Sequence, residues 1–205
     1  MNDDMLIRGR TLEEIAAQLS ELSRELVSSG RYDLLLRSIG VAALEELRIE
    51  AARQQLSRLL IAKDYRFILV DYKNKEVELT PVHKAVYLLF LNHPEGIEFK
   101  KLQDFREELL EYYMATARLV DKATIESSVD MLVNPLNNSI NEKCSRIKST
   151  FLGIMDPYTA YYYIVSSHTK KHVAGSSRVW YERLKNIILP RELVVFEGDT
   201  FCGIK

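Results

Sequence analysis

The amino-acid sequence predicts a mainly helical α+β fold with small β-sheets. Three observations predict it. A capped, leucine-rich helical pattern occupies residues 11–29, and two short strand-like runs follow at 67–72 and 76–79. Beyond them, apolar residues at helical spacing recur between proline and glycine stops. The helices would therefore form the bulk of the protein, and the strands a minor part.

The first 62 residues are expected to form a helical oligomerisation segment. Thr11 and Glu14 have the spacing of a capping box, and Gly30 ends the helical pattern. A second helix is predicted over 41–62, after Gly40. The first helix carries a leucine seam that steps by 3 and 4 residues, as in a coiled coil: Leu12, Ile15, Leu19, Leu22 and Leu26. The seam can pack on the second helix or pair across a homodimer, and we favour the homodimer.

The remaining residues, 63–205, are expected to form a second domain that begins with a β-hairpin. A helix should start at Thr80-Pro81, where the Thr80 hydroxyl can accept a hydrogen bond from a free backbone N–H. It should end before Pro94 and Gly96. Further elements are predicted in this order: helices over 99–115, 123–133 and 138–152, a strand over 159–166, a polar loop over 167–177, a short amphipathic piece around Trp180, and an apolar closing run over 186–196.

The stretch LTPVHKAVYLLFLNHPEG, residues 79–96, resembles the start of the OmpR/PhoB-type effector domain. Arg146 and Lys148 in SRIKSTF also match the Arg-x-Lys of that family's recognition helix. The resemblance covers roughly residues 66–165. It implies a winged helix-turn-helix in a bacterial transcriptional regulator that binds double-stranded DNA, with a recognition helix at about 138–152 and a wing after it. The family's receiver domain is absent from these 205 residues.

The predicted recognition helix is amphipathic. At about 100° per residue, Ile140, Cys144, Ile147 and Phe151 share one side, opposite polar residues. We expect four side chains to face base edges in the major groove: Asn141, Ser145, Arg146 and Ser149. We expect four lysines to lie near phosphates, the last two in the wing region: Lys143, Lys148, Lys170 and Lys171. An ordinary amphipathic surface helix has the same pattern, so that interpretation stays open.

The distribution of charge along the chain favours a polyanionic partner for residues 143–191. The net charge is −1, but residues 143–191 contain nine basic side chains against Asp156 and Glu182. A local basic patch on a neutral protein can still bind phosphate groups. Glu142 on the polar face and the overall charge favour a second hypothesis, a protein-interaction module that keeps a winged-helix scaffold without binding DNA.

Other function classes have little support in the sequence. No catalytic motif is present, so we expect neither an enzyme nor a cofactor. His168 and His172 are four residues apart without a nearby third ligand, so no metal site is expected. The chain has no apolar run long enough to span a membrane, and its first residues lack the apolar stretch of a secretory signal. With only two cysteines, we expect a cytoplasmic protein.

Overall fold

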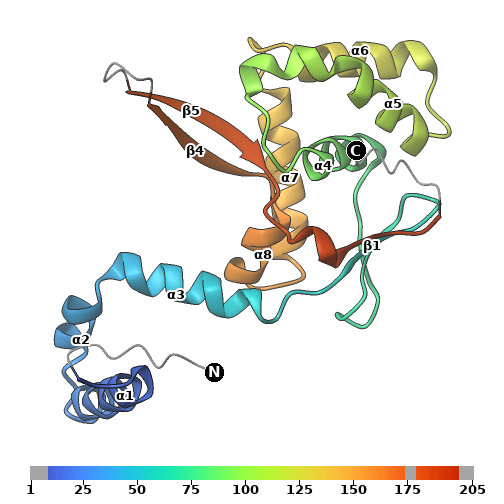
Figure 1. The fold of residues 1–205 in the computed structure, drawn as a ribbon. Coiled ribbons are helices and arrows are strands. Elements are labelled where there is room, and N and C mark those ends of the chain that lie inside the picture. The colour runs from blue at the N-terminus through green and yellow to red at the C-terminus, as the bar shows by residue number, and fades with distance from the viewer. Residues whose placement is uncertain (1–8, 174–178, 199–205) are drawn as a thin grey trace. The chain divides into compact units, whose positions relative to one another are not determined.

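The computed structural model describes residues 9–173 and 179–198, and Figure 1 shows their arrangement. The chain divides into two compact units, Met1–Ala51 and Ala52–Lys205. The described residues are mainly helical, with a four-stranded and a two-stranded sheet. The predicted α+β class is therefore confirmed at this level.

The first unit contains α1 (Leu12–Ser28), α2 (Tyr32–Ile39) and most of α3 (Val41–Arg53). The predicted capping box is present, since the Thr11 N–H donates to Glu14 Oε2 at 2.9 Å and the Glu14 N–H donates to Thr11 Oγ1 at 3.2 Å. The prediction of the first helix is therefore confirmed.

The rest of this region differs from the prediction. The sequence reading missed α2, which contacts α1 in the structure. The second predicted helix ends at Arg53 instead of continuing to residue 62, and Leu59–Ile61 forms strand β1. An apolar run of this length fits either a helix or a strand, and pairing with two other strands decides the outcome.

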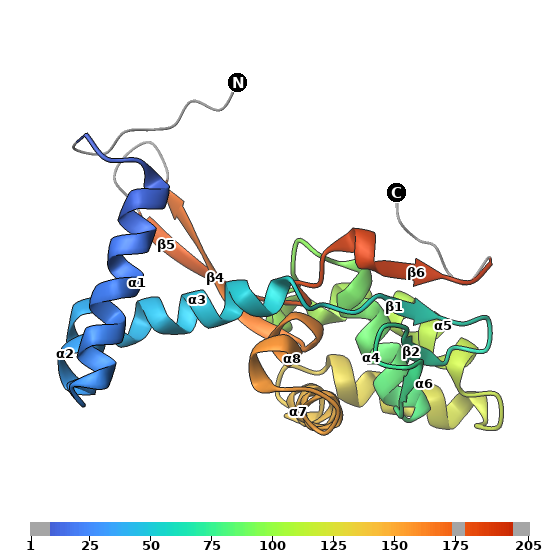
Figure 2. The same ribbon diagram turned by 90° about the horizontal axis from the view of Figure 1, so that it is seen from below.

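The four-stranded sheet has the order β3-β2-β1-β6. The predicted hairpin is present as β2 (Phe67–Leu69) and β3 (Lys75–Val77), which pair antiparallel. Lys73 and Asn74, within the connection 70–74, both have left-handed backbone angles, and the Lys75 N–H donates to the Tyr72 carbonyl at 3.1 Å to close the turn. Strand β6 (Val194–Phe196) pairs parallel to β1, and Figure 2 shows the two strands side by side. The closing apolar run thus extends a sheet that begins far earlier in the chain.

Helix α4 (Pro81–Asn92) is the centre of the second unit, and its residues 85–91 are all buried. Pro81 is the first helical residue, as predicted, but the predicted cap is wrong. The Thr80 side chain makes no capping hydrogen bond among the described residues, because its hydroxyl pairs with His83 Nδ1 at 2.6 Å. The Tyr87 ring lies 5.3 Å from Phe67 and 5.5 Å from Phe151, so it joins the sheet to helix α7.

Helices around α4 complete the core. The predicted helix over 99–115 is a 3₁₀ turn, η1 (Phe99–Phe105), continued by α5 (Arg106–Thr116). The next two predicted helices are confirmed as α6 (Lys122–Val133) and α7 (Ser139–Leu152). Helix α7 packs on α4, and α6 packs on α5 and α7.

The predicted strand over 159–166 is wrong, because most of it is helix α8 (Pro157–Tyr163). Asp156 caps this helix, as its Oδ1 accepts hydrogen bonds from the N–H groups of Tyr158 (2.9 Å) and Thr159 (3.2 Å). Pro157 occupies the first helical position. These two start signals outweigh the strand preference of the three tyrosines that follow.

An antiparallel hairpin follows α8. Strands β4 (Ser166–Val173) and β5 (Val179–Asn186) pair from Ser166↔Asn186 to Val173↔Val179, where the sequence predicted a polar loop and a short amphipathic piece. At its base, Ile97 and Lys185 exchange two backbone hydrogen bonds, of 2.9 and 3.0 Å. Figure 1 shows the hairpin projecting from the helices of its unit.

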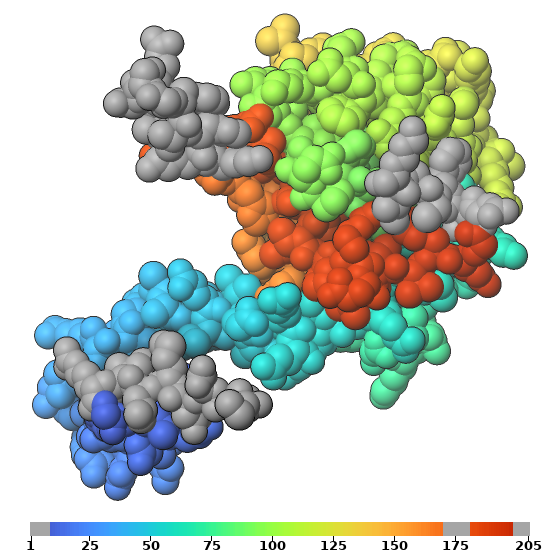
Figure 3. Space-filling model, in the orientation of Figure 1, coloured from blue at the N-terminus to red at the C-terminus, as the bar shows by residue number. Residues whose placement is uncertain are grey.

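The chain then returns to the sheet through a 3₁₀ turn, η2 (Arg191–Leu193). This segment, red in Figure 3, lies against the green surface that follows α4. Two side chains hold the end of α4 and the turn after it. Asn186 Nδ2, at the end of β5, donates to the Pro94 carbonyl at 2.8 Å, and Arg191 in η2 donates to the Leu91 carbonyl. The end of α4 and the base of the hairpin are therefore fixed to each other.

Candidate nucleic-acid interface

Helix α7 has the two faces that its sequence predicts. Ile140, Ile147 and Phe151 are buried, and Cys144 is half-buried beside them. Six side chains on the helix are exposed and polar: Asn141, Glu142, Ser145, Arg146, Lys148 and Ser149. The predicted polar face is therefore a free surface within the described part of the chain.

The polar face has two flanks. At about 100° per residue, Asn141, Ser145 and Lys148 fall on one flank, while Lys143 and Arg146 fall on the other. Glu142 and Ser149 lie between the flanks. The neighbours differ accordingly, because Asn141 lies beside Phe99 and Lys100, whereas Arg146 lies beside Thr80 and His83. The predicted site residues therefore occupy two separate environments.

The Asn141 flank adjoins a groove that continues to the hairpin. A cavity of about 150 Å³ lies at the α6–α7 turn, lined by Phe99, Lys100, Leu132, Asn134, Pro135, Asn137, Ile140 and Asn141. A second cavity of about 350 Å³ is lined by Glu98, Phe99, Lys100, Tyr181 and Arg183. The two cavities share Phe99 and Lys100, so we treat them as one feature, the hairpin groove.

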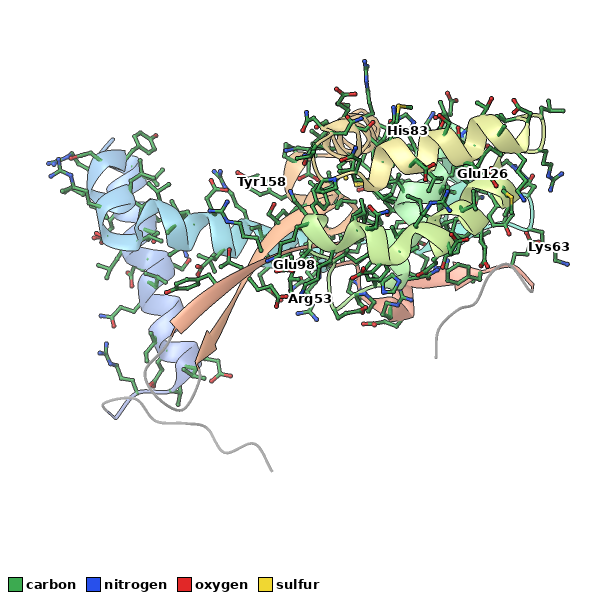
Figure 4. All side chains as sticks on the ribbon, turned by 90° about the horizontal axis from the view of Figure 1, so that it is seen from above. Arg53, Lys63, His83, Glu98, Glu126 and Tyr158 are labelled. Atoms are coloured by element: carbon green, nitrogen blue, oxygen red, sulfur yellow. The ribbon has the colours of Figure 1, made fainter. Side chains whose placement is uncertain are left out.

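The hairpin groove carries a surplus of positive charge. The Glu98 side chain is only 7% exposed and forms ion pairs with Lys101 (2.9 Å) and Lys100 (3.2 Å). The hydrogen bond from Lys101 is the main reason why the pKa of Glu98 is below its usual range. Figure 4 labels Glu98 where η1 meets the hairpin. Lys101 also lies 3.5 Å from Glu182.

Two cations on β5 add to this surplus. Arg183 lines the groove, and the Lys185 ammonium lies 5.2 Å from the centre of the Phe99 ring, in a cation–π contact. Together with Lys100 and Lys101, four cations thus oppose three carboxylates, Glu98, Asp104 and Glu182, along η1 with its N-cap and β5. A phosphate group would be attracted to this part of the surface.

Cys144 does not offer a nucleophile. Burial raises the pKa of its thiol to about 12, although the nearby Lys185 ammonium acts in the opposite direction. The thiol therefore stays protonated at neutral pH and behaves as a small apolar side chain.

The Arg146 flank borders a different cavity. It has a volume of about 320 Å³ and is lined by Glu78, Leu79, Thr80, His83, Arg146, Ser149 and Thr150. The pKa of His83 is lowered, first by burial and then by the charges of Lys143 and Arg146. The imidazole is therefore neutral at pH 7 and lies next to two cations.

Lys170 and Lys171 are placed only through their backbone. They belong to β4, opposite Glu182 and Tyr181. Their side chains lie outside the described residues, so the predicted phosphate contacts of these lysines stay predictions. The hairpin itself occupies the position in the chain where the sequence predicts a wing region.

Other candidates from the sequence are occupied by structural contacts. Tyr162 and Tyr163 are buried, and half-buried Tyr161 contacts the Tyr162 and His168 rings. His168 Nε2 also pairs with Ser166 Oγ at 2.8 Å. Within residues 9–173 and 179–198, no three His, Cys, Asp or Glu side chains are grouped so that they could hold a metal ion.

Sequence reasoning counted Arg183 and Lys185 among the basic residues of 143–191 without placing them at the site, and it missed Lys100 and Lys101. A pattern for them exists, because Tyr181, Arg183 and Lys185 alternate along β5 and so share one face of the strand. Lys100 and Lys101 directly follow Phe99 in the sequence. Only the fold brings these two short patterns together with Asn141.

None of the described helices is long and apolar enough to cross a membrane. Comparisons of the chain with protein-family models, with curated proteins and with solved structures gave no match.

Proposed function

We propose that this protein is a DNA-binding transcriptional regulator of the winged helix-turn-helix type. Helices α6 and α7 would form the helix-turn-helix, and the hairpin of β4 and β5 would be the wing. One observation carries the proposal: Asn141 on α7 and Arg183 on β5 line adjoining cavities that share Phe99 and Lys100. A recognition helix and a wing that act on one duplex require this adjacency.

The bridge between Ile97 and Lys185 supports the same proposal. It ties the base of the hairpin to the segment after α4, so the wing has a fixed position relative to the helices. A fixed wing loses little conformational freedom on binding, which favours affinity.

In this proposal, α7 enters the major groove. Asn141, Ser145 and Ser149 would face base edges, and Lys143 and Lys148 would lie nearer the phosphates. Lys170 and Lys171 would contact the backbone from the wing, joined by Lys100 and Arg183 in the hairpin groove. Glu142, in the middle of the polar face, would select a cytosine, whose N4 amino group can donate to a carboxylate.

The first unit would supply a homodimer contact. Leu12, Leu19 and Leu22 of α1 are 55%, 58% and 51% exposed, and α1 and α2 contain no buried residue within the described chain. A cavity of about 420 Å³ between α1 and α2 is lined partly by Leu19, Leu22 and Leu35. A second copy would cover this apolar surface and allow two winged helices to bind two half-sites.

That same apolar surface favours a second candidate function, a protein-interaction module without DNA binding. In that case, a different protein would cover the α1–α2 surface, and α7 would not contact nucleic acid. DNA binding separates the two candidates.

Fluorescence anisotropy with a labelled random duplex tests the proposal. We expect binding at about 50 mM salt and a loss of at least tenfold in affinity at about 200 mM, because bound cations release counterions from DNA. Arg183→Gln should reduce the slope of log K against log[salt] by about 1. Lys122→Gln, which removes an exposed charge paired with Glu126 on α6, is the matched control and should leave the slope unchanged. If no DNA binds even at low salt, the proposal is wrong.

A further inference from the structure

The cavity on the Arg146 flank of α7 has the composition of a phosphate site. Its lining combines an exposed guanidinium, the His83 ring, and the hydroxyl-bearing residues Thr80, Ser149 and Thr150. Lys143 is close enough for its charge to lower the pKa of His83. Arg146 is the one cation and Glu78 the one carboxylate in the lining, and Lys143 adds a second positive charge near the cavity.

The polar groups of this cavity are not all engaged within the protein. Ser149 and Thr150 donate to the carbonyls of Ser145 (3.0 Å) and Arg146 (3.2 Å), so these two hydroxyls are used by the helix. The His83 ring is held by Thr80 through Nδ1, but its Nε2 is buried and has no hydrogen-bond partner in residues 9–173 and 179–198. Arg146 forms no ion pair within these residues, and its guanidinium can bind a phosphate with two parallel hydrogen bonds.

The position of the cavity matters as much as its composition. It lies on the flank of α7 opposite Asn141 and the hairpin groove. A helix in the major groove has a sugar-phosphate backbone on each side of it, about 12 Å apart. If the hairpin groove follows one strand, the cavity with Arg146 and His83 is where the other strand passes.

We infer that Arg146 and Lys143 hold a phosphate group in the cavity beside His83, and that this phosphate belongs to the DNA strand opposite the hairpin. The inference rests on the proposed function. It assigns Arg146 to backbone contact rather than to base reading. It also makes His83 a reporter, because a bound phosphate anion stabilises the protonated imidazole.

The titration of His83 in NMR spectra tests the inference. The chain has four histidines, and the His83 resonance is identified by its absence in His83→Gln or, if that variant does not fold, by ring-to-backbone correlation. One arm contains a short DNA duplex, a second contains inorganic phosphate, and a third contains chloride at equal ionic strength. Anisotropy measures DNA binding separately.

We expect the duplex to raise the pKa of His83 by about one unit. Arg146→Gln should abolish that rise, whereas Lys122→Gln, which removes an exposed charge on α6, should preserve it. If both variants abolish the rise, the pKa of His83 responds to the net charge of the surface and not to a phosphate held by Arg146, and the inference is wrong.

The arms separate the inference from the proposed function. DNA binding with an unchanged His83 pKa overturns the phosphate site and leaves DNA binding intact. A rise in inorganic phosphate without DNA binding supports the site for free phosphate and overturns the proposed function. No rise in either arm overturns the site, and anisotropy alone then decides the proposed function.

Discussion

The Tyr163 hydroxyl makes two hydrogen bonds to the backbone of Ser57. It accepts one from the Ser57 N–H at 2.7 Å and donates one to the Ser57 carbonyl at 2.6 Å. Both residues are buried, and the Tyr163 ring stacks on Phe151 at 5.6 Å. This one side chain therefore fixes the start of β1 against α8 and α7.

Tyr163→Phe should destabilise the second unit by about 2–4 kcal/mol, because it leaves a buried N–H and a buried C=O without their partner. Denaturant unfolding followed by circular dichroism measures the change. Tyr161→Phe removes a hydroxyl from a half-buried neighbour and should cost less than about 0.5 kcal/mol. Equal losses in the two variants would show that the Ser57 contacts contribute nothing specific.

Stability should depend on pH through His93. Burial lowers its pKa, but hydrogen bonds to Glu108 (2.9 Å) and Glu95 (2.7 Å) outweigh burial, and the net pKa is raised. A raised folded-state pKa stabilises the protein below the unfolded value of about 6.5, and this contribution disappears as pH rises through the folded value. His93→Gln should remove that decrease, measured as the free energy of unfolding between about pH 5 and 8.

His83 is the control for that experiment, because its pKa is shifted the other way. Burial and the charges of Lys143 and Arg146 lower it, so its contribution is present above about pH 6.5 and is lost as pH falls. His83→Gln should therefore reduce the loss of unfolding free energy as pH falls below about 6.5. His93→Gln should instead reduce the loss of unfolding free energy as pH rises above that value. The same change of slope in both variants would contradict the assignment.

Leu19→Asp should convert a dimer into a folded monomer that binds DNA much more weakly. A carboxylate cannot be buried in an apolar contact without a large desolvation cost. Light scattering gives the mass, and anisotropy gives the affinity. Ala17→Asp places the same charge at an exposed position on the other face of α1 and should leave both unchanged. An unaltered mass for Leu19→Asp, or an unfolded chain, would exclude the leucine seam as the interface.

Gly96→Ala should displace the base of the hairpin. Gly96 has a φ of +90°, and a Cβ there would lie 2.8 Å from the Cβ of Leu184. The substitution should cost about 1–3 kcal/mol and weaken the bridge between Ile97 and Lys185. We expect faster hydrogen exchange at the Lys185 amide. Gly153→Ala has ordinary backbone angles and a nearest contact of 3.4 Å, so its effect should stay within about 0.5 kcal/mol.

Local patterns predicted much of this fold. The Thr11–Glu14 cap, the turn at Lys73 and Asn74, and the apolar stripe of α7 each determine their element within a few residues. Strand β1 was missed because its apolar run also continues the helical pattern before it, and only pairing with β2 and β6 makes it a strand. Strands β4 and β5 were missed because both carry many polar side chains, so their pairing, rather than an apolar alternation, identifies them.

The candidate site was predictable only in part. The exposed residues of α7 follow from helical spacing, because the apolar stripe determines which side is free. The division of the polar face of α7 into two different environments depends on the residues that lie beside each flank in the fold. Lys100, Arg183 and His83 come from three separate segments, and no spacing in the sequence relates them to Asn141 or Arg146.

The parallel pairing of β1 with β6 has a consequence for synthesis on the ribosome. Strand β6 is the last of the described elements to be translated, yet it occupies an edge of the sheet that β1 begins. Until residues 194–196 leave the exit tunnel, β1 exposes unpaired backbone groups along that edge. The nascent second unit would therefore wait for its final strand, and contacts of such long range fold slowly.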